Sequence, residues 1–286
     1  MLSIFLAASL AFTSEDASLA YTTAEKLVAE HTPRDAGTRR GNIAANYLLD
    51  AASATGADVR RDVFVARTPK GDRTFVNLYA ELKADDDAPW TVVVSHFDTK
   101  SGVNCPGAND GASTSGLLVA LSDALFRCRE GRGNVMLMWL DGEECMEAYG
   151  EDDGLWGSRR AAKVLAERGC KVAGVVCLDM LGDRDLTVFV AKNGTQSLVE
   201  KALAAAKTAG TSGKVSSSAV LVKDDHVPFL DAGFPAIDLI DFEFGSAPGM
   251  NDYWHSDQDT MDKVSKESLE TVGRLVVELV KMLAQG

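Results

Sequence analysis

Residues 91–100 read TVVVSHFDTK, and this stretch decides the fold. A short run of β-branched residues without polar alternation is typical of a strand that is buried on both faces of a sheet. The run ends in an imidazole and a carboxylate, His96 and Asp98. In α/β proteins, polar groups that follow a buried strand lie at the carboxyl edge of the sheet, where ligands bind. We therefore expect a functional site directly after this strand.

Similar strands alternate with helices along the rest of the chain. Buried-strand patterns are expected at 90–95, 134–140, 173–178 and 234–240. Helical spacing of apolar residues is found over 113–126, 157–168, 198–209 and 266–284. Upstream, two helices within 24–54 and two strands at 58–66 and 74–82 are predicted. The alternation predicts one α/β domain with a central, mostly parallel mixed sheet and helices on both faces.

The N-terminal stretch differs from the rest of the chain. Residues 2–12 are almost wholly apolar, which resembles the apolar region of a secretory signal. No Lys or Arg precedes Lys26, so the usual basic region is missing. We expect 1–19 to be a signal or an N-terminal segment and 20–286 to be the catalytic domain. Export to the periplasm or medium is favoured, and a cytoplasmic location is the alternative.

Charge and hydropathy exclude two classes of partner. The formal net charge is −13, whereas nucleic-acid-binding proteins present a basic surface. We therefore expect no nucleic-acid partner. No segment is long and apolar enough for stable insertion into a membrane, because even residues 2–12 are too short to span a bilayer.

Acidic residues and histidines cluster at the ends of the predicted strands. Each one alone has an ordinary explanation, such as a helix cap at Asp110 or an exposed turn at Glu143-Glu144. Their joint order is harder to explain that way, because the carboxyl ends of parallel strands meet at one edge of a sheet. Imidazole and carboxylate groups that converge in one crevice suit a zinc ion.

Six motifs carry a resemblance to a known superfamily. In chain order they read HFDTK, GANDGASTSGLL, DGEE, LDMLG, DDHVPF and YWHSDQDT. The sequence resembles the co-catalytic zinc aminopeptidases and the animal-type glutaminyl cyclases, from about Val92 to the C-terminus. The resemblance implies the zinc exopeptidase fold and an enzyme that acts on peptide or protein N-termini.

Residue roles follow from the same resemblance. Five positions match the metal ligands of the superfamily, which hold one or two zinc ions: His96, Asp110, Glu144, Asp179 and His255. In the aminopeptidases the residue matching Asp110 bridges two ions. Asp98 matches the carboxylate that orients a ligand histidine. Glu143 matches the general acid/base, and in the cyclases the residues matching Asp179 and Asp224 join its proton network.

The resemblance leaves the reaction open between two enzymes. The Asp224-Asp225-His226 sequence and the insertion after the Glu pair resemble the cyclases, which convert N-terminal Gln to pyroglutamate and release ammonia. A metallo-aminopeptidase is the alternative, and an inactive peptide-binding member is a third reading that the complete ligand set opposes.

The expected substrate pocket departs from the animal cyclases at two positions. Tyr149 stands where the animal enzymes have Trp, and Lys223 stands where they have Gln. Asp225, His226 and Trp254 are the other residues expected to line the pocket. We also consider a disulfide between Cys105 and Cys145, because both would lie near its rim.

Overall fold

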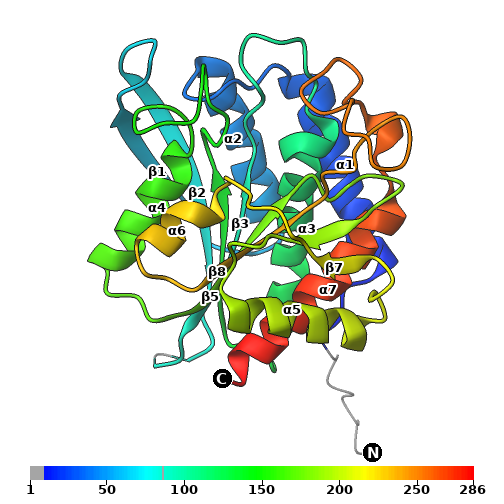
Figure 1. The fold of residues 1–286 in the computed structure, drawn as a ribbon. Coiled ribbons are helices and arrows are strands. Elements are labelled where there is room, and N and C mark those ends of the chain that lie inside the picture. The colour runs from blue at the N-terminus through cyan, green and yellow to red at the C-terminus, as the bar shows by residue number, and fades with distance from the viewer. Residues whose placement is uncertain (1–9, 86) are drawn as a thin grey trace, which may run out of the picture.

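An eight-stranded mixed sheet forms the centre of the protein, as a computed structural model describes it for residues 10–85 and 87–286 (Figure 1). The strand order is β1-β2-β4-β3-β5-β8-β6-β7. The strands are β1 (Val59–Ala66), β2 (Arg73–Leu82), β3 (Trp90–His96), β4 (Asn134–Leu140), β5 (Val172–Asp179), β6 (Val188–Val190), β7 (Val215–Ser217) and β8 (Ala236–Ile240). The central strands β4, β3, β5 and β8 are parallel, and β2 and β6 flank them in the antiparallel direction.

Alternate residues of the central strands serve two hydrophobic cores. In β3, Val93 packs into the larger core, whereas Val92 and Val94 point to the smaller core on the other face. In β4, Leu137 faces the larger core and Met138 the smaller one. A strand buried on both sides has no polar face, which explains the continuous apolar runs in the sequence.

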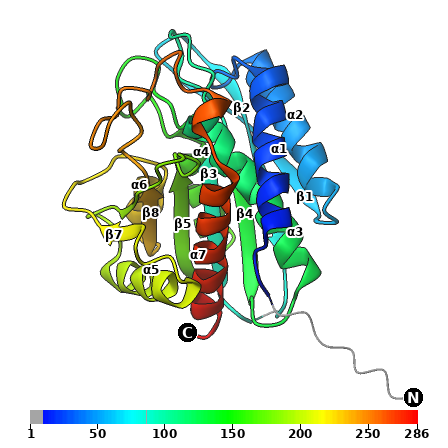
Figure 2. The ribbon, with the colours of Figure 1, turned by 90° about the vertical axis from the view of Figure 1, so that its right-hand side faces the viewer.

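Helices cover both faces of the sheet (Figures 1 and 2). The larger layer contains α1 (Ser14–His31), α2 (Arg39–Ser53), α3 (Thr114–Arg127), α5 (Gln196–Ala209) and α7 (Lys266–Ala284). The smaller layer contains α4 (Trp156–Glu167) and α6 (His226–Asp231), which contact each other. An irregular helical turn, η1 (Ala108–Ser113), leads into α3, and a short turn, η2 (Met261–Lys263), precedes α7. The predicted fold class, a single α/β domain, is confirmed.

Helix α1 begins ten residues before the helix that the sequence predicted. Thr13 caps it, since its side chain accepts a hydrogen bond from Asp16 N–H while the Asp16 carboxylate accepts one from Thr13 N–H. Leu10 and Phe12 are buried in the larger core. Residues 10–19 therefore pack with the rest of the domain, although they were expected to belong to a signal or N-terminal segment. The rest of the apolar stretch, residues 1–9, lies outside the described residues.

Among residues 10–85 and 87–286, no helix is long and apolar enough to cross a membrane.

The elements that the sequence did not predict are short, namely β6, β7 and α6. They lie between residues 188 and 231, in the part of the chain that follows β5. Their brevity explains the omission, because three to six residues show no clear periodicity.

Candidate active site

Neighbouring parallel strands deliver the candidate residues to one edge of the sheet. His96 is the last residue of β3, and Asp179 is the last residue of β5. Glu143 and Glu144 follow β4, which ends at Leu140 next to His96. The parallel register thus brings groups from distant parts of the chain together, as expected for the carboxyl edge of an α/β sheet.

The predicted ligands form two groups that share Asp110. His96 Nε2 lies 3.1 Å from Asp110 Oδ1 and 3.1 Å from Asp179 Oδ1. His255 Nε2 lies 3.3 Å from Asp110 Oδ2 and 2.8 Å from Glu144 Oε1. Within each group the potential ligand atoms lie within 4.8 Å of one another. Each oxygen of Asp110 therefore faces a different group, so this carboxylate could contribute a ligand to either group.

Asp110 is fixed by the backbone around it. Asp259 accepts hydrogen bonds from Asn109 N–H at 2.7 Å and Asp110 N–H at 3.1 Å. The next residue, Gly111, has φ +90°, and a Cβ there would lie 3.0 Å from the Asp98 carbonyl oxygen and 3.0 Å from His96 Cε1. Only glycine tolerates both the positive φ and the close contacts. The chain can therefore pass closely behind the His96 ring.

Asp98 connects the two strand ends. Its carboxylate accepts hydrogen bonds from the backbone N–H groups of Gly142 at 2.9 Å, Glu143 at 3.1 Å and Glu144 at 3.2 Å. The same carboxylate lies 3.5 Å from His96 Nδ1. Asp98 therefore holds the loop that carries both glutamates and lies beside the His96 ring, where the resemblance implied a carboxylate that orients the histidine.

A buried arginine that was not predicted supports the segment between His96 and Asp110. Arg34 is fully buried, and its guanidinium donates to the carbonyl oxygens of Phe97 at 2.6 Å and Pro106 at 2.8 Å, and to that of Gly107. These carbonyls flank the segment between His96 and Asp110. Arg34 thereby compensates part of the negative charge in this region, where the buried Asp98 and Asp259 also lie.

Backbone strain is concentrated at the ligands. Among the described residues, the non-glycine residues with positive φ are Leu155, Met180 and His255. His255 is itself a candidate ligand with φ 53°, and Met180 with φ 55° follows Asp179 directly. Non-glycine residues in this region cost free energy and are often found where function fixes a side chain.

The clustered acids change one another's protonation. Burial raises the pKa of Glu144 to about 7, and the charge of Asp110 adds to this. Burial likewise raises the pKa of Asp179 to about 7. Burial lowers the pKa of His255, but its hydrogen bonds to Asp110 and Glu144 outweigh that effect and raise it to about 9. Burial and the neighbouring Glu144 charge raise the pKa of Glu143 well above its ordinary value.

This donor set fits a divalent metal. Both histidines direct Nε2 toward carboxylate oxygens, and imidazole nitrogen with carboxylate oxygen is a usual zinc ligand combination. The carboxylates are buried and close together, so a cation would offset their mutual repulsion. His96 Nδ1, on the far side of the ring, faces Asp98 rather than the other ligands, as expected for a histidine that binds metal through Nε2.

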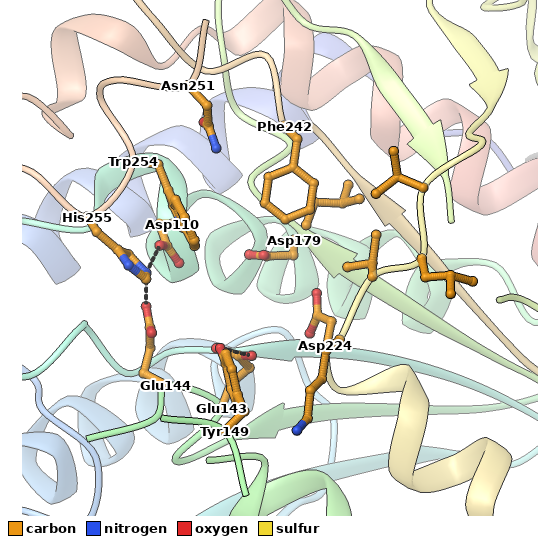
Figure 3. Close-up of a pocket in the computed structure, with 15 residues that line it drawn as sticks. Asp110, Glu143, Glu144, Tyr149, Asp179, Asp224, Phe242, Asn251, Trp254 and His255 are labelled. Carbon is orange, nitrogen blue, oxygen red and sulfur yellow. Dashed lines mark hydrogen bonds and ion pairs between the residues drawn. The ribbon is translucent and has the colours of Figure 1, made fainter. Parts of the chain in front are cut away.

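Four of the five predicted ligands form the floor of a cavity of about 360 Å³: Asp110, Glu144, Asp179 and His255. Figure 3 shows the carboxylates of Asp110, Asp179 and Asp224 directed into it, with Trp254 and Phe242 above them. Lys223 and the apolar side chains of Val220, Leu221, Val222 and Ile240 complete its wall, together with Asn251. Its size and mixed lining suit one amino-acid side chain rather than a long segment.

Aromatic side chains fix two walls of this cavity. Tyr149 O–H donates to Glu143 Oε1 at 2.7 Å, so the candidate acid/base and the pocket wall are joined. The Trp254 ring stacks on the His255 ring with centroids 4.0 Å apart, and Phe242 meets Trp254 edge-on at 5.9 Å. Phe242 was not among the residues expected in the pocket, but it lines it.

Two residues expected in the pocket lie behind it. Asp225 and His226 are fully buried and do not line the cavity. His226 Nε2 lies 2.8 Å from Asn193 Nδ2, within the protein. The expectation that they contact substrate is therefore corrected: α6 starts at His226 and turns both side chains inward, while Asp224 alone of the Asp224–His226 triplet reaches the cavity.

The disulfide considered between Cys105 and Cys145 is wrong. Both are free thiols, each with another partner. Cys105 Sγ lies 4.0 Å from Asp259 Oδ2, whereas Cys145 Sγ lies 3.1 Å from Lys100 Nζ. A shared position near the rim therefore did not imply contact between the two thiols.

Comparisons with known proteins agree with this geometry. Residues 77–280 match peptidase family M28. A glutaminyl-peptide cyclotransferase of Drosophila melanogaster is 28% identical over 85% of this chain and 76% of its own length. The crystal structure of an Acidobacteriales bacterium glutaminyl cyclase is 30% identical with a TM-score of 0.86, covering 97% of this chain and 98% of that one.

Other solved structures share the fold. A Porphyromonas gingivalis glutaminyl cyclase is 25% identical with a TM-score of 0.83, covering 96% of this chain and 99% of that one. A leucine aminopeptidase precursor from Bacteroides thetaiotaomicron has a TM-score of 0.82 at 23% identity, with 95% and 97% covered. These likenesses confirm the superfamily that the motifs indicated, and this chain belongs to peptidase family M28.

Proposed function

We propose that this protein is a zinc-dependent glutaminyl-peptide cyclotransferase, which converts an N-terminal Gln to pyroglutamate. One observation carries the proposal: a metal-binding floor lies below a small aromatic-walled cavity in which Glu143 is held by Tyr149 O–H at 2.7 Å. Such a cavity encloses one side chain and one N-terminus. The similarity to a bacterial glutaminyl cyclase at 30% identity supports the same reaction.

The metal would be held by Asp110, Glu144 and His255, with His96 and Asp179 available for a second ion. Bound zinc would polarise the γ-amide carbonyl of the substrate Gln. The walls formed by Tyr149 and Trp254 would hold the Gln side chain in a folded conformation, so that its α-amine lies near the carbonyl carbon of the γ-amide.

Glu143 would move the proton. The α-nitrogen forms a bond to the γ-amide carbon, and the carbon–nitrogen bond of the amide breaks. Glu143 takes a proton from the attacking amine and returns it to the leaving nitrogen, which departs as ammonia. The raised pKa of Glu143, caused by burial and the neighbouring charges of Glu144 and Asp224, suits a group that must both accept and release a proton near neutral pH.

A metallo-aminopeptidase is the second candidate, and a specific feature favours it. Asp110 directs one oxygen to each of two ligand groups, which is the geometry of a co-catalytic pair of ions. In that reaction Glu143 would take a proton from water instead of from the substrate amine. The family assignment is compatible with both reactions.

The two functions differ in their products. We expect zinc-loaded protein to convert Gln-naphthylamide to pyroglutamyl-naphthylamide with release of ammonia, and to leave Leu- and Ala-naphthylamide intact. Release of free naphthylamine from any of these substrates, without a coupling peptidase, would replace the cyclase proposal by the aminopeptidase.

The location of the protein follows from neither the fold nor the family. We propose export, because the apolar start of the chain resembles a signal, and the burial of Leu10 and Phe12 in the core implies that any cleavage falls before residue 10. N-terminal sequencing of protein from its native host, separated into cell and medium fractions, tests this. A mature chain that starts at Met1 and remains in the cytoplasm would contradict export.

A further inference from the structure

A second hollow adjoins the candidate active site. It has a volume of about 540 Å³ and lies against the loop after the glutamate pair, α4 and α6. Of the residues that line the two cavities, Lys223 lines both. A peptide whose first residue occupies the active-site cavity would therefore pass Lys223 when it continues into this second hollow.

The two cavities differ in charge. The ionisable side chains of the first are five carboxylates and His255, with Lys223 at its border. The second is lined by Arg159, Lys163 and Lys223 together with Glu151 and Asp231, so cations outnumber acids there. The whole chain carries a formal charge of −13, which makes a local excess of positive charge beside the active site a specific feature.

The charges of Lys223 and Arg159 are not matched by carboxylates. Lys223 is exposed, and none of the ion pairs found in the described residues involves it. Its Nζ lies 5.4 Å from the ring centroid of Tyr149, on the pocket wall. Arg159 donates to the backbone carbonyl oxygens of Gly150 and Glu151, which fixes the guanidinium but leaves its charge without a counter-ion.

The position of Lys223 fixes which part of a substrate it can meet. Tyr149 connects it to the reacting end, since the Tyr149 hydroxyl bonds to Glu143 at 2.7 Å and Lys223 Nζ lies beside the same ring. The path from the Glu143 carboxylate across the Tyr149 side chain to Lys223 Nζ is no longer than roughly three extended residues at ~3.4 Å each. Lys223 is therefore within reach of the second and third residues of a bound peptide.

We propose that the second hollow binds the residues following the N-terminal one, and that Lys223 makes the enzyme prefer peptides with an acidic side chain at the second or third position. The inference rests on the proposed action at peptide N-termini. An ammonium group at the border attracts a carboxylate on the substrate and repels an ammonium group there. Because the contact lies away from the reacting atoms, it changes KM rather than kcat.

The test compares peptides that differ only in charge. Gln-Ala-Glu-amide, Gln-Ala-Gln-amide and Gln-Ala-Lys-amide are cyclised by zinc-loaded protein at low ionic strength, with a second set that carries the variable residue at position two. We expect kcat/KM to fall from the Glu to the Gln to the Lys peptide by about two- to fivefold per step in at least one set, which is the range of exposed ion pairs. The difference should shrink in 0.5 M salt, where screening is strong (Debye length ~4 Å).

Variants of Lys223 distinguish a direct attraction between Lys223 and the substrate from an effect of the protein's overall charge. Lys223→Gln should remove most of the preference, and Lys223→Glu should invert its order. The matched control is Lys171→Gln, which removes the same charge from an exposed site just before β5, at the opposite edge of the sheet. Equal kcat/KM for the Glu and Lys peptides in both sets, or an unchanged order in Lys223→Glu, would overturn the inference.

A binding measurement keeps the inference separate from the cyclase proposal. Calorimetric titration with pyroglutamyl-Ala-Glu-amide and pyroglutamyl-Ala-Gln-amide, and with the matching pair that varies position two, needs no turnover. Tighter binding of an acidic peptide to the unmodified protein, but not to Lys223→Gln, supports the second site even if no Gln peptide is cyclised. Equal binding within both pairs contradicts it even if cyclisation occurs.

Discussion

The floor and the rim of the active-site cavity are built in different ways. The floor consists of candidate ligands that are mostly buried, and carboxylates behind them hold the backbone: Asp98 fixes the Glu143-Glu144 loop and Asp259 fixes Asp110. The rim carries exposed side chains, among them Leu221 at 69% exposure and Trp254 at 38%. The difference indicates that the floor determines the chemistry, whereas the rim can vary to select substrates.

Glu143→Gln should have the largest effect. The substitution keeps the size and the backbone contacts of the side chain but removes the group that moves the proton. We expect kcat on Gln-naphthylamide to fall by about 10²–10⁴-fold while the zinc content, measured by atomic absorption, stays the same. Glu147→Gln, at an exposed position of the same loop, is the control. A Glu143→Gln protein that remains fully active would remove Glu143 from the mechanism.

Asp98→Ala tests how far the floor depends on its anchor. The substitution removes three hydrogen bonds from the 142–144 backbone and the carboxylate beside His96. We expect zinc affinity to fall by about 10- to 100-fold, because groups behind the ligands tune metal binding by this factor. Competition with a fluorescent chelator measures it. Asp58→Ala, on the exposed start of the sheet, should leave the affinity unchanged.

Tyr149→Phe changes a side chain that joins the pocket wall to Glu143 on the floor. We expect a smaller loss of activity than for Glu143→Gln. The Tyr149 hydroxyl donates to Glu143, so it favours the ionised form of that carboxylate. Its loss should lower kcat/KM by about two- to tenfold, the range of a single hydrogen bond. The rise of activity with pH should also move to higher pH. A pH profile that coincides with that of the unmodified enzyme would argue against the Tyr149–Glu143 contact during turnover.

Removing the metal should change how the stability of the folded protein depends on pH. Compared with the three substitutions above, this is the smallest expected effect. In the metal-free protein, the pKa values of Glu144 and Asp179 are raised to about 7, above those of unfolded carboxyl groups near 4. The folded state then binds more protons between these values, so stability falls as pH rises from 4 to 7. The raised pKa of His255, about 9 against 6.5, acts in the same direction between pH 6.5 and 9.

Chelation should therefore lower Tm more at pH 8 than at pH 6. Thermal unfolding with zinc or with a chelator at both pH values measures the difference. A chelator effect that is equal at the two pH values, or larger at pH 6, would show that the ligand carboxylates do not take up protons when the metal leaves.

The sequence predicted the floor better than the rim. His96, Asp110 and Glu144 follow strands or open a helix, and the parallel sheet brings such positions together whatever their separation in the chain. Arg34 and Asp259 were not predicted, because their role is to bond backbone groups that only the folded loops bring close. Arg34 could be suspected only from its place beside the Pro33 break, which indicates a turn but not its neighbours.

The rim depends on loop conformations that periodicity does not describe. Val220 and Leu221 look like ordinary apolar residues, and nothing in the sequence places them opposite Tyr149 in one cavity. Asp225 and His226 were assigned to the pocket because they adjoin Asp224, yet the start of α6 turns them inward. The early start of α1 could have been found from Thr13 and Asp16, whose spacing forms a capping box.

The zinc content of dialysed protein tests the central claim most directly. If Asp110, Glu144 and His255 meet to hold zinc, the zinc-loaded chain should retain at least one ion after exhaustive dialysis. Asp110→Ala should then retain none, while Asp257→Ala, an exposed acid on the loop of His255, should behave like the unmodified chain. An unmodified protein that retains no zinc, or an Asp110→Ala protein that retains as much as its parent, would contradict the account.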